Sequence, residues 1–142
     1  MSNSGFTFRR VREELIETLL DLGIKDFRVL DAISQVPRHI FLDEAFWSRA
    51  YENRSLTIGY KQTISQPFIV AYMTDMLDVS PLHTVLEIGT GSGYQAAVLS
   101  EVALRVFTAQ RDSAFVTSTM FPRTSIIQRG RSAGERGGEL TV

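Results

Sequence analysis

The first apolar residues of the chain repeat at helical spacing. They occur every three or four positions between about residues 7 and 22, at Phe8, Val11, Leu15, Leu19 and Leu22. This spacing predicts an amphipathic helix that turns these side chains inward, and Gly23 is expected to end it. The charged residues between them include Arg9, Arg10 and Arg12 with acidic neighbours one turn away, which favours a paired surface over an anion site.

A second helix and an aromatic segment are expected next. Asp26 can cap a helix that buries Val29, Leu30, Ile33 and Val36 and ends at Pro37. Large rings dominate burial, so the aromatic residues that follow are expected to fasten this helical cap to a sheet. These residues are Phe41, Phe46, Trp47 and Tyr51.

An apolar strand, three glycines and a helix follow one another between residues 84 and 101. The run Val85-Leu86-Glu87-Ile88 precedes Gly89, Gly91 and Gly93, and the residues after them have helical character. A turn at the carboxyl end of such a strand presents backbone N–H groups to a ligand. Residues 105–109 are expected to form a second, parallel strand. The order of elements predicts an α/β fold.

The spacing of the glycines separates two classes of nucleotide-type site. Dinucleotide sites use G-x-G-x-x-G, whereas here the third glycine comes two residues after the second, and Glu87 stands two residues before the first. This Glu-x-Gly-x-Gly-x-Gly pattern resembles the first motif of S-adenosylmethionine-dependent methyltransferases with a Rossmann-like sheet. An ordinary glycine-rich turn is the simpler interpretation.

Residues 58–67, Ile-Gly-Tyr-Lys-Gln-Thr-Ile-Ser-Gln-Pro, place several hydrogen-bonding side chains in a short stretch. One interpretation is a polar loop in which Ser65 or Gln66 caps the next helix, although a cap needs only one such residue. Pro67 suits the first turn of that helix. Its apolar residues Ile69, Met73, Met76 and Leu77 are expected to face inward.

Composition and charge exclude several classes of protein. The formal net charge of -1 gives no electrostatic reason to expect nucleic acid or an acidic membrane as partner, and the absence of cysteine excludes a disulfide framework. His39 and His83 lack ligand spacing, so no metal site is expected and both are predicted to be structural or surface residues. A polar start and the lack of a long apolar run predict a cytoplasmic protein without a membrane span.

The chain therefore divides into three regions. Residues 1–80 are expected to form a helical region that contains the polar loop at 58–67, residues 81–111 to start a Rossmann-like sheet, and residues 112–142 to form an irregular tail without a sustained period. A sheet of only two strands would leave an edge unpaired, through which the chain could dimerise. The sequence leaves the oligomeric state open.

Three segments together resemble one family, the protein-L-isoaspartate O-methyltransferases, over about residues 8 to 108. They are Val36-Pro37-Arg38 with Phe41-Leu42-Asp43-Glu44-Ala45, Ile58-Gly59 with Gln62-Thr63-Ile64-Ser65-Gln66-Pro67, and Val85 to Tyr94. The resemblance implies an N-terminal helical cap and the first part of a Rossmann-like parallel sheet that is incomplete. It also implies transfer of a methyl group from S-adenosylmethionine to the free carboxylate of L-isoaspartyl residues in damaged peptides and proteins, a repair reaction.

The resemblance also assigns roles to residues. Ser65 matches the active-site position and is expected to orient the acceptor carboxylate. The remaining matched positions are expected to contact the cofactor: Thr63, Ile64, Gln66, Glu87, Gly89, Thr90, Gly91, Gly93 and Gln110. A carboxylate is ionised at pH 7 and needs no general base, which agrees with a chain that offers no convincing base.

Two departures from the family pattern keep other functions open. Gln110 stands where the family usually has an acidic residue for the ribose hydroxyls, so that contact is expected to be weaker. After residue 111 the resemblance ends, and a frameshifted or prematurely ended reading frame is our hypothesis for this change. A catalytically inactive cofactor-binding fragment or interaction module is the alternative function. A methyltransferase with another acceptor and a dehydrogenase are more distant alternatives.

Overall fold

The computed structural model describes residues 4–59, 61–110 and 124–128, with side chains from residue 8 to residue 109. Three α-helices and two 3₁₀ helices precede and surround a short hairpin, and a strand–helix–strand unit follows. In chain order the elements are α1 (Ser4–Asp21), α2 (Phe27–Gln35), η1 (Arg38–Phe41), η2 (Glu44–Arg49), β1 (Leu56–Gly59), β2 (Gln62–Ile64), α3 (Pro67–Met76), β3 (Thr84–Ile88), α4 (Tyr94–Val102), β4 (Arg105–Gln110) and β5 (Thr124–Gln128).

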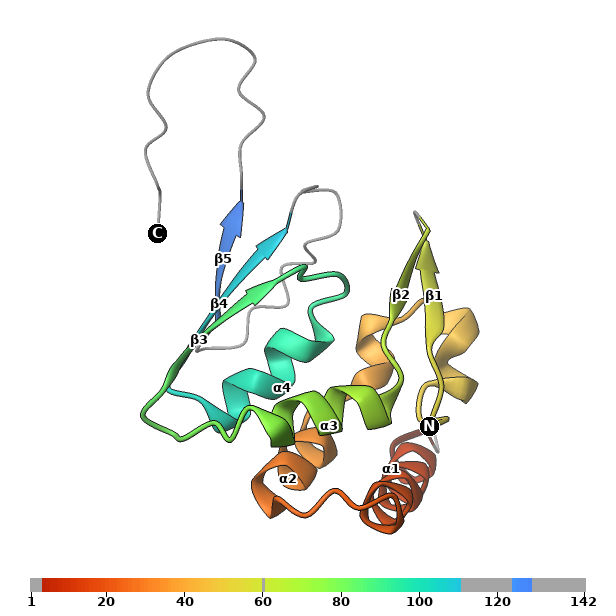
Figure 1. The fold of residues 1–142 in the computed structure, drawn as a ribbon. Coiled ribbons are helices and arrows are strands. Elements are labelled where there is room, and N and C mark those ends of the chain that lie inside the picture. Colours follow the sequence, from red (N-terminus) through yellow and green to blue (C-terminus); the bar gives the residue numbers. More distant parts are fainter. Residues whose placement is uncertain (1–3, 60, 111–123, 129–142) are drawn as a thin grey trace, which may run out of the picture.

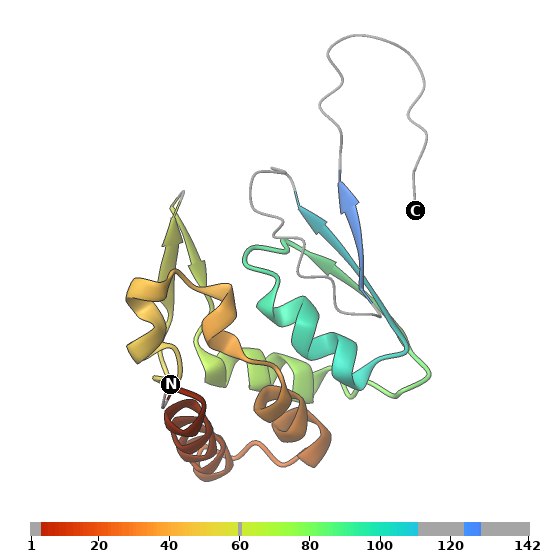
Figure 2. The same ribbon diagram turned by 180° about the vertical axis from the view of Figure 1, so that it is seen from behind.

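Two sheets stand side by side above α3. The strands β1 and β2 form an antiparallel hairpin, and β3, β4 and β5 form a parallel sheet in that order. The hairpin rises from one end of α3 and the parallel sheet from the other, as both views show (Figures 1 and 2). In the parallel sheet Thr84 pairs with Arg105 and Ile88 with Ala109, so the carboxyl ends of β3 and β4 lie together. The α/β class with a Rossmann-like parallel sheet is confirmed.

The first two helices agree with their sequence pattern. Leu15 and Leu19 are buried in α1, and Gly23 takes a left-handed conformation (φ +98°) just after the helix ends. The Asp26 side chain accepts a hydrogen bond from the Arg28 backbone N–H at 2.8 Å and caps α2. The prediction for Leu22 was wrong, because this residue lies beyond the last turn of α1 and is half exposed.

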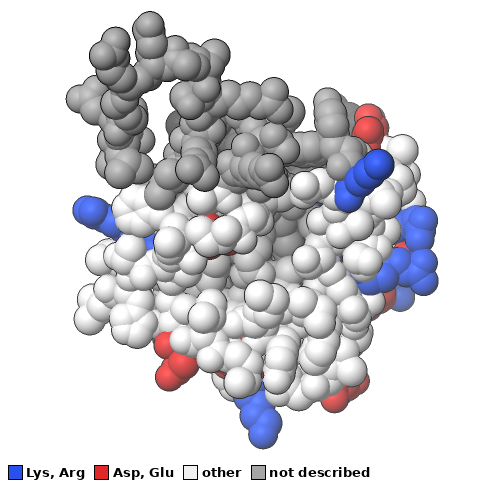
Figure 3. Space-filling view, turned by 45° about the horizontal axis from the view of Figure 1, so that its top comes forward, with Lys and Arg blue, Asp and Glu red and all other residues white. Residues whose placement is uncertain are grey.

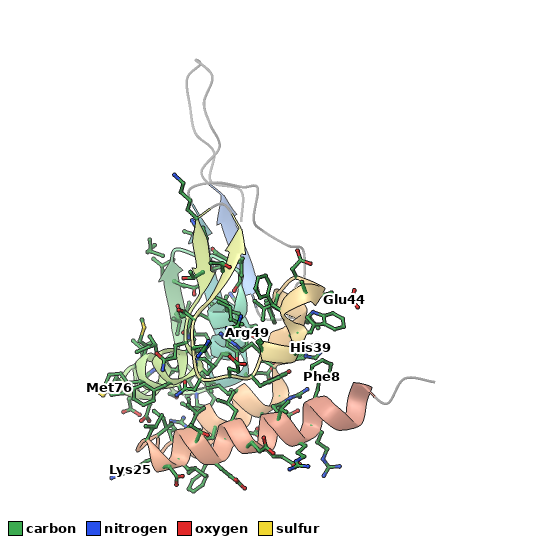
Figure 4. All side chains as sticks on the ribbon, turned by 90° about the vertical axis from the view of Figure 1, so that its right-hand side faces the viewer. Phe8, Lys25, His39, Glu44, Arg49 and Met76 are labelled. Atoms are coloured by element: carbon green, nitrogen blue, oxygen red, sulfur yellow. The ribbon has the colours of Figure 1, made fainter. Side chains whose placement is uncertain are left out.

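The aromatic segment packs mainly on α1 rather than on the sheet. The Phe8 and His39 rings stack with centroids 4.1 Å apart, Trp47 meets both edge-on, and the Tyr51 hydroxyl lies 2.8 Å from His39 Nδ1. Figure 4 shows Phe8 on α1 beside His39. Among the ring contacts of the described residues, the edge contact of Phe41 with Tyr94 links this segment to α4 beside the parallel sheet. The expected attachment to the sheet was therefore wrong for Trp47 and Tyr51.

The apolar face of α3 differs from the prediction. Ile69, Met73, Met76 and Leu77 are all substantially exposed, and the buried residues are Pro67, Val70, Ala71 and Thr74. Almost every position of α3 is apolar, so its periodicity could not indicate which side faces the core. Strand β3 shows the same one-sided burial, because Leu86 and Ile88 lie on its exposed face while Val85 and Glu87 turn toward the helices.

The parallel sheet has one strand more than the sequence indicated. Strand β5 pairs with β4, from Val106 opposite Thr124 to Gln110 opposite Gln128. This strand lies within the region predicted to be an irregular tail, most of which falls outside the described residues. None of the helices in the described ranges is long and apolar enough to cross a bilayer.

Candidate cofactor and acceptor site

A hollow of about 330 Å³ lies between the end of the hairpin and the carboxyl end of β3. Its size falls within the range of small-molecule sites. Seven of the residues predicted to act at the site line it: Thr63, Ile64, Ser65, Glu87, Gly89, Thr90 and Gly91. Across this face of the molecule most exposed side chains are uncharged, and the charged ones lie mainly toward its rim (Figure 3). The fold therefore brings together two segments that are about twenty residues apart in sequence.

The glycine turn forms one wall of this hollow. Gly89, Gly91 and Gly93 all have positive φ values, of +95°, +54° and +84°. The backbone N–H groups of Gly89 and Thr90 donate to the Ala109 carbonyl, at 2.7 and 3.3 Å, and so anchor the turn to the end of β4. A Cβ atom added at Gly89 would meet no heavy atom within 4 Å. The left-handed backbone therefore explains this glycine, and the space beside it is open to a ligand.

Among the described residues that line the hollow, Glu87 carries the only carboxylate, and it ends a chain of hydrogen-bonded side chains. The Thr108 hydroxyl donates to Glu87 Oε2, and the Thr90 hydroxyl lies 2.6 Å from the Thr108 hydroxyl. Because Thr108 has one hydroxyl proton, Thr90 donates to Thr108 when Thr108 donates to Glu87. Burial raises the pKa of Glu87 to about 7, and the hydrogen bond from Thr108 offsets part of this shift.

The opposite wall comes from the end of the hairpin. Ile64 is buried and anchors β2, whereas Thr63 and Ser65 on either side of it are exposed. Ser65 lies between β2 and α3, but neither it nor Gln66 caps the helix through its side chain. Instead, Asn53 Oδ1 accepts a hydrogen bond from the Phe68 N–H at 3.0 Å. The capping interpretation was therefore wrong, and the Ser65 hydroxyl is not used for that purpose.

Three predicted residues lie outside the lining. Gln66 is half-buried at the start of α3, and its carbonyl accepts from the Val70 N–H. Gly93 precedes α4 in the N-cap position, where a Cβ would approach Phe41 Cε1 to 3.9 Å. Gln110 ends β4 and pairs with Gln128, and its side chain lies outside the described set. Its predicted contact with the ribose stays a prediction.

Other residues of the site were not predicted from the sequence. Met73 and Leu77 of α3 line the hollow together with Tyr94 and Gln95 of α4. The spacing of Met73 and Leu77 by four residues was visible, but it was interpreted as a core stripe. Thr108 gave a weaker signal: two residues after buried Val106, it lies on the same face of β4 and reaches Glu87 on the neighbouring strand.

Neither histidine belongs to a catalytic or metal group in the described ranges. His39 is half-buried in the aromatic cluster, where burial lowers its pKa, and the His83 ring nitrogen Nδ1 accepts from the Ser80 N–H. Within these ranges no three His, Cys, Asp or Glu side chains gather as metal ligands would. The polar side chains that line the hollow are those of Thr63, Ser65, Glu87, Thr90, Ser92, Tyr94 and Gln95.

Comparison with known proteins gives a consistent result. Residues 9–113 match the family model described as protein-L-isoaspartate(D-aspartate) O-methyltransferase. The protein-L-isoaspartate O-methyltransferase of Alkalilimnicola ehrlichii is 56% identical over 108 residues, which cover 75% of this chain and 49% of that protein. That of Methylobacillus flagellatus is 55% identical over 112 residues, covering 78% and 50%. The chain spans about half the length of these curated relatives.

Two solved structures have a similar fold. A protein-L-isoaspartate O-methyltransferase superposes with a TM-score of 0.66 at 30% identity, covering 73% of this chain and 35% of that one. A putative protein-L-isoaspartate O-methyltransferase from Plasmodium falciparum, in complex with S-adenosyl-L-homocysteine, gives 0.60 at 24% identity, covering 74% and 51%. The latter likeness concerns the fold alone. The matched sequence, the matched fold and the paired walls of the hollow agree, and the chain belongs to the protein-L-isoaspartate O-methyltransferase family.

Proposed function

We propose that this chain binds S-adenosylmethionine at the glycine turn and transfers its methyl group to the carboxylate of L-isoaspartyl residues. The observation that supports this most is the shared hollow: the turn and the Thr63–Ser65 segment line one space of about 330 Å³. A donor on one wall and an acceptor on the other would then meet without any large movement of the chain. A cytoplasmic location and a role in protein repair belong to the same proposal.

The residues at the turn suit the methionine and ribose portions of this cofactor. The open space beside Gly89 lets a ligand approach the backbone closely. The amino end of α4, at Tyr94, supplies the positive end of a helix dipole for the amino-acid carboxylate. Glu87 places a carboxylate in the wall, which a cationic ammonium group or ribose hydroxyls would contact. Gly91, Gly93, Thr90 and Gln110 are part of this proposed set.

The acceptor side requires orientation rather than a base. When bound, S-adenosylmethionine supplies a methyl group on a sulfonium, which is already a good leaving group. An isoaspartyl carboxylate is ionised at pH 7, so the chain has to hold it in line and exclude water. The exposed Ser65 hydroxyl has no hydrogen-bond partner assigned within the described residues and can donate to the carboxylate. Thr63, Ile64 and Gln66 complete this side of the proposed site.

Replacing Ser65 by alanine tests the proposed acceptor role. We expect turnover on an isoaspartyl peptide to fall about 10- to 100-fold, because one orienting hydrogen bond contributes roughly 1.5–3 kcal/mol when a charged group accepts it. The affinity for S-adenosylhomocysteine, measured by calorimetry, should stay within about twofold. Equal losses of turnover and cofactor affinity would contradict a role confined to the acceptor. The same peptide with a normal aspartyl residue is the control substrate.

A second candidate function is cofactor binding without transfer. It is favoured by the open edge of β3, which pairs only with β4 in the described part of the sheet, and by the exposed face with Leu86 and Ile88. A chain that binds S-adenosylhomocysteine but methylates no isoaspartyl peptide would support this candidate. Detectable transfer to the isoaspartyl peptide, absent with the aspartyl control, would exclude it.

A further inference from the structure

Arg38 is a buried cation that the proposed reaction does not use. Its side chain is completely buried, the largest in the chain to be so among the described residues. No acidic side chain pairs with it in that part of the structure. Burial lowers the pKa of its guanidinium, and its Nη1 has no hydrogen-bond partner there. Burying such a charge costs free energy, which only its hydrogen bonds and its contacts with aromatic rings can offset here.

The contacts of Arg38 reach the acceptor side of the hollow. Its Nε donates to the Ala50 carbonyl at 2.8 Å, and its Nη2 approaches the Arg54 carbonyl at 3.4 Å. These carbonyls bracket the turn before β1, and Asn53 in the same turn caps α3. Ser65 lies between β2 and the first residues of α3. By holding this turn, Arg38 therefore fixes the hairpin β1–β2 and α3, the two elements between which Ser65 lies.

The same side chain also reaches the cofactor side. The Arg38 guanidinium lies over the Tyr94 ring, 4.9 Å from its centroid, and Tyr94 is the first residue of α4 after the glycine turn. Phe41, one turn later in η1, meets the Tyr94 ring edge-on and approaches Gly93. Such a cation–ring contact is strongest where water is excluded. One guanidinium thus touches the supports of both walls.

We propose that Arg38 is a positioning residue that sets the separation between the Thr63–Ser65 segment and the glycine turn. The planar fork of arginine permits this, because it donates to two carbonyls in its plane while its face rests on a ring. The lysine ammonium keeps the charge but cannot make both kinds of contact at once. The consequence for ligand binding rests on the proposed function, whereas the effect on the separation does not.

Arg12 provides a matched control. It also donates to a backbone carbonyl, that of Ser34 at 2.9 Å, and lies over a tyrosine ring, that of Tyr51 at 5.5 Å. Its Nε, like Arg38 Nη1, is buried without a partner in the described region. Arg12 joins α1 to α2, and neither arginine is itself part of the lining of the hollow. The two arginines differ in which elements they connect and in burial, since Arg12 is only half-buried.

The test measures the separation of the hairpin and α4, the two elements that carry the walls. The chain has no cysteine, so spin labels can be attached at introduced cysteines at exposed Thr57 on β1 and exposed Glu101 on α4. We expect Arg38→Lys to broaden or shift the pulsed-resonance distance distribution, and Arg12→Lys to leave it unchanged. An unchanged distribution in Arg38→Lys, or an equal change in both variants, would overturn the proposal. If Arg38→Lys does not fold, Tyr94→Leu, which removes the ring platform, replaces it, with Tyr94→Phe as the variant that keeps the ring.

Calorimetry with S-adenosylhomocysteine separates this proposal from the proposed function. Binding to the wild-type chain tests the function alone. If the wild-type chain binds, Arg38→Lys should weaken the affinity for S-adenosylhomocysteine at least fivefold and Arg12→Lys less than twofold. Each variant is measured below its melting temperature. If the wild-type chain binds no ligand while Arg38→Lys still changes the distance distribution, the result would support the positioning role and contradict the cofactor site. Equal losses of affinity in both variants would contradict the positioning role.

Discussion

Helices α2 and α3 are both short, but α2 buries its branched aliphatic side chains in a core, whereas α3 leaves most of its larger apolar side chains exposed. Val29, Leu30 and Ile33 of α2 are at most 3% exposed, whereas Met73 and Met76 of α3 are 55% and 67% exposed. The buried side of α2 is covered by α1 and by α4, within one core that runs from α1 to β4. By contrast, α3 and the outward face of β3 leave apolar surface uncovered in the described part of the molecule. The difference indicates that this closed core supplies most of the stability, while the site lies where the core borders the open apolar surface.

The largest expected effect is the loss of a side chain from the closed core. Leu19 is fully buried in α1, and Leu19→Ala should lower the free energy of unfolding by about 2–5 kcal/mol, because it removes apolar contacts and leaves a cavity. Met76→Ala on the exposed face should change it by less than about 0.5 kcal/mol. Urea unfolding of both variants measures the contrast. Similar losses in the two would contradict the division into a closed and an open part.

Protonation of Glu87 should affect stability at the junction of the two parts. Its pKa is raised to about 7 in the folded chain, above the usual 4.5, so the folded state binds more protons between these pH values. The free energy of unfolding should therefore fall as the pH rises from about 4.5 to 7, by at most about 3 kcal/mol. Below this range the carboxyl is protonated in both states.

Glu87→Gln isolates this effect from the other carboxyl groups. The difference in unfolding free energy between the wild type and the variant should depend on pH through this window and level off outside it. Chemical unfolding at several pH values measures it. A difference that does not vary with pH would contradict the raised pKa of Glu87.

A smaller effect is expected at the start of α3. Asn53→Ala removes the oxygen that accepts from the Phe68 N–H, and the loss of such a cap costs roughly 1 kcal/mol. Gln66→Ala, at the N-cap position itself, should cost less, because the Gln66 side chain makes no cap hydrogen bond. Thermal unfolding compares the two variants. A larger loss of stability in Gln66→Ala than in Asn53→Ala would contradict the assignment of the α3 cap to Asn53.

The sequence predicted the elements whose patterns are local. The stripe of α1, the Asp26 cap, and the succession of β3, glycine turn and α4 all depend on neighbouring residues. The hairpin β1–β2 was not predicted because its strands, Leu56–Gly59 and Gln62–Ile64, are too short for an alternation of apolar and polar residues to stand out. The cap of α3 was also missed, because Asn53 lies fifteen residues from its partner.

Site residues were likewise predicted where a local motif marks them and missed where only packing places them. The motif residues Ser65 and Glu87 were identified from the sequence, and the structure brings their segments to one hollow. The contributions of Met73, Tyr94 and Thr108 depend on how helices and strands pack, which a periodic pattern leaves undetermined. The orientation of α3 illustrates this, since a helix that is apolar on all sides does not indicate which side will be covered.

The most direct test of the account is the thermal unfolding of the purified chain with and without S-adenosylhomocysteine. A ligand that binds only the native state raises the melting temperature, and the rise grows with the logarithm of the ligand concentration once this exceeds Kd. We predict a cooperative transition that rises with ligand concentration and that no longer does so in Gly89→Val, where a β-branched residue is forced into a left-handed backbone. A transition that ignores the ligand in the wild type would contradict the claim that the glycine turn and the hairpin form a cofactor site.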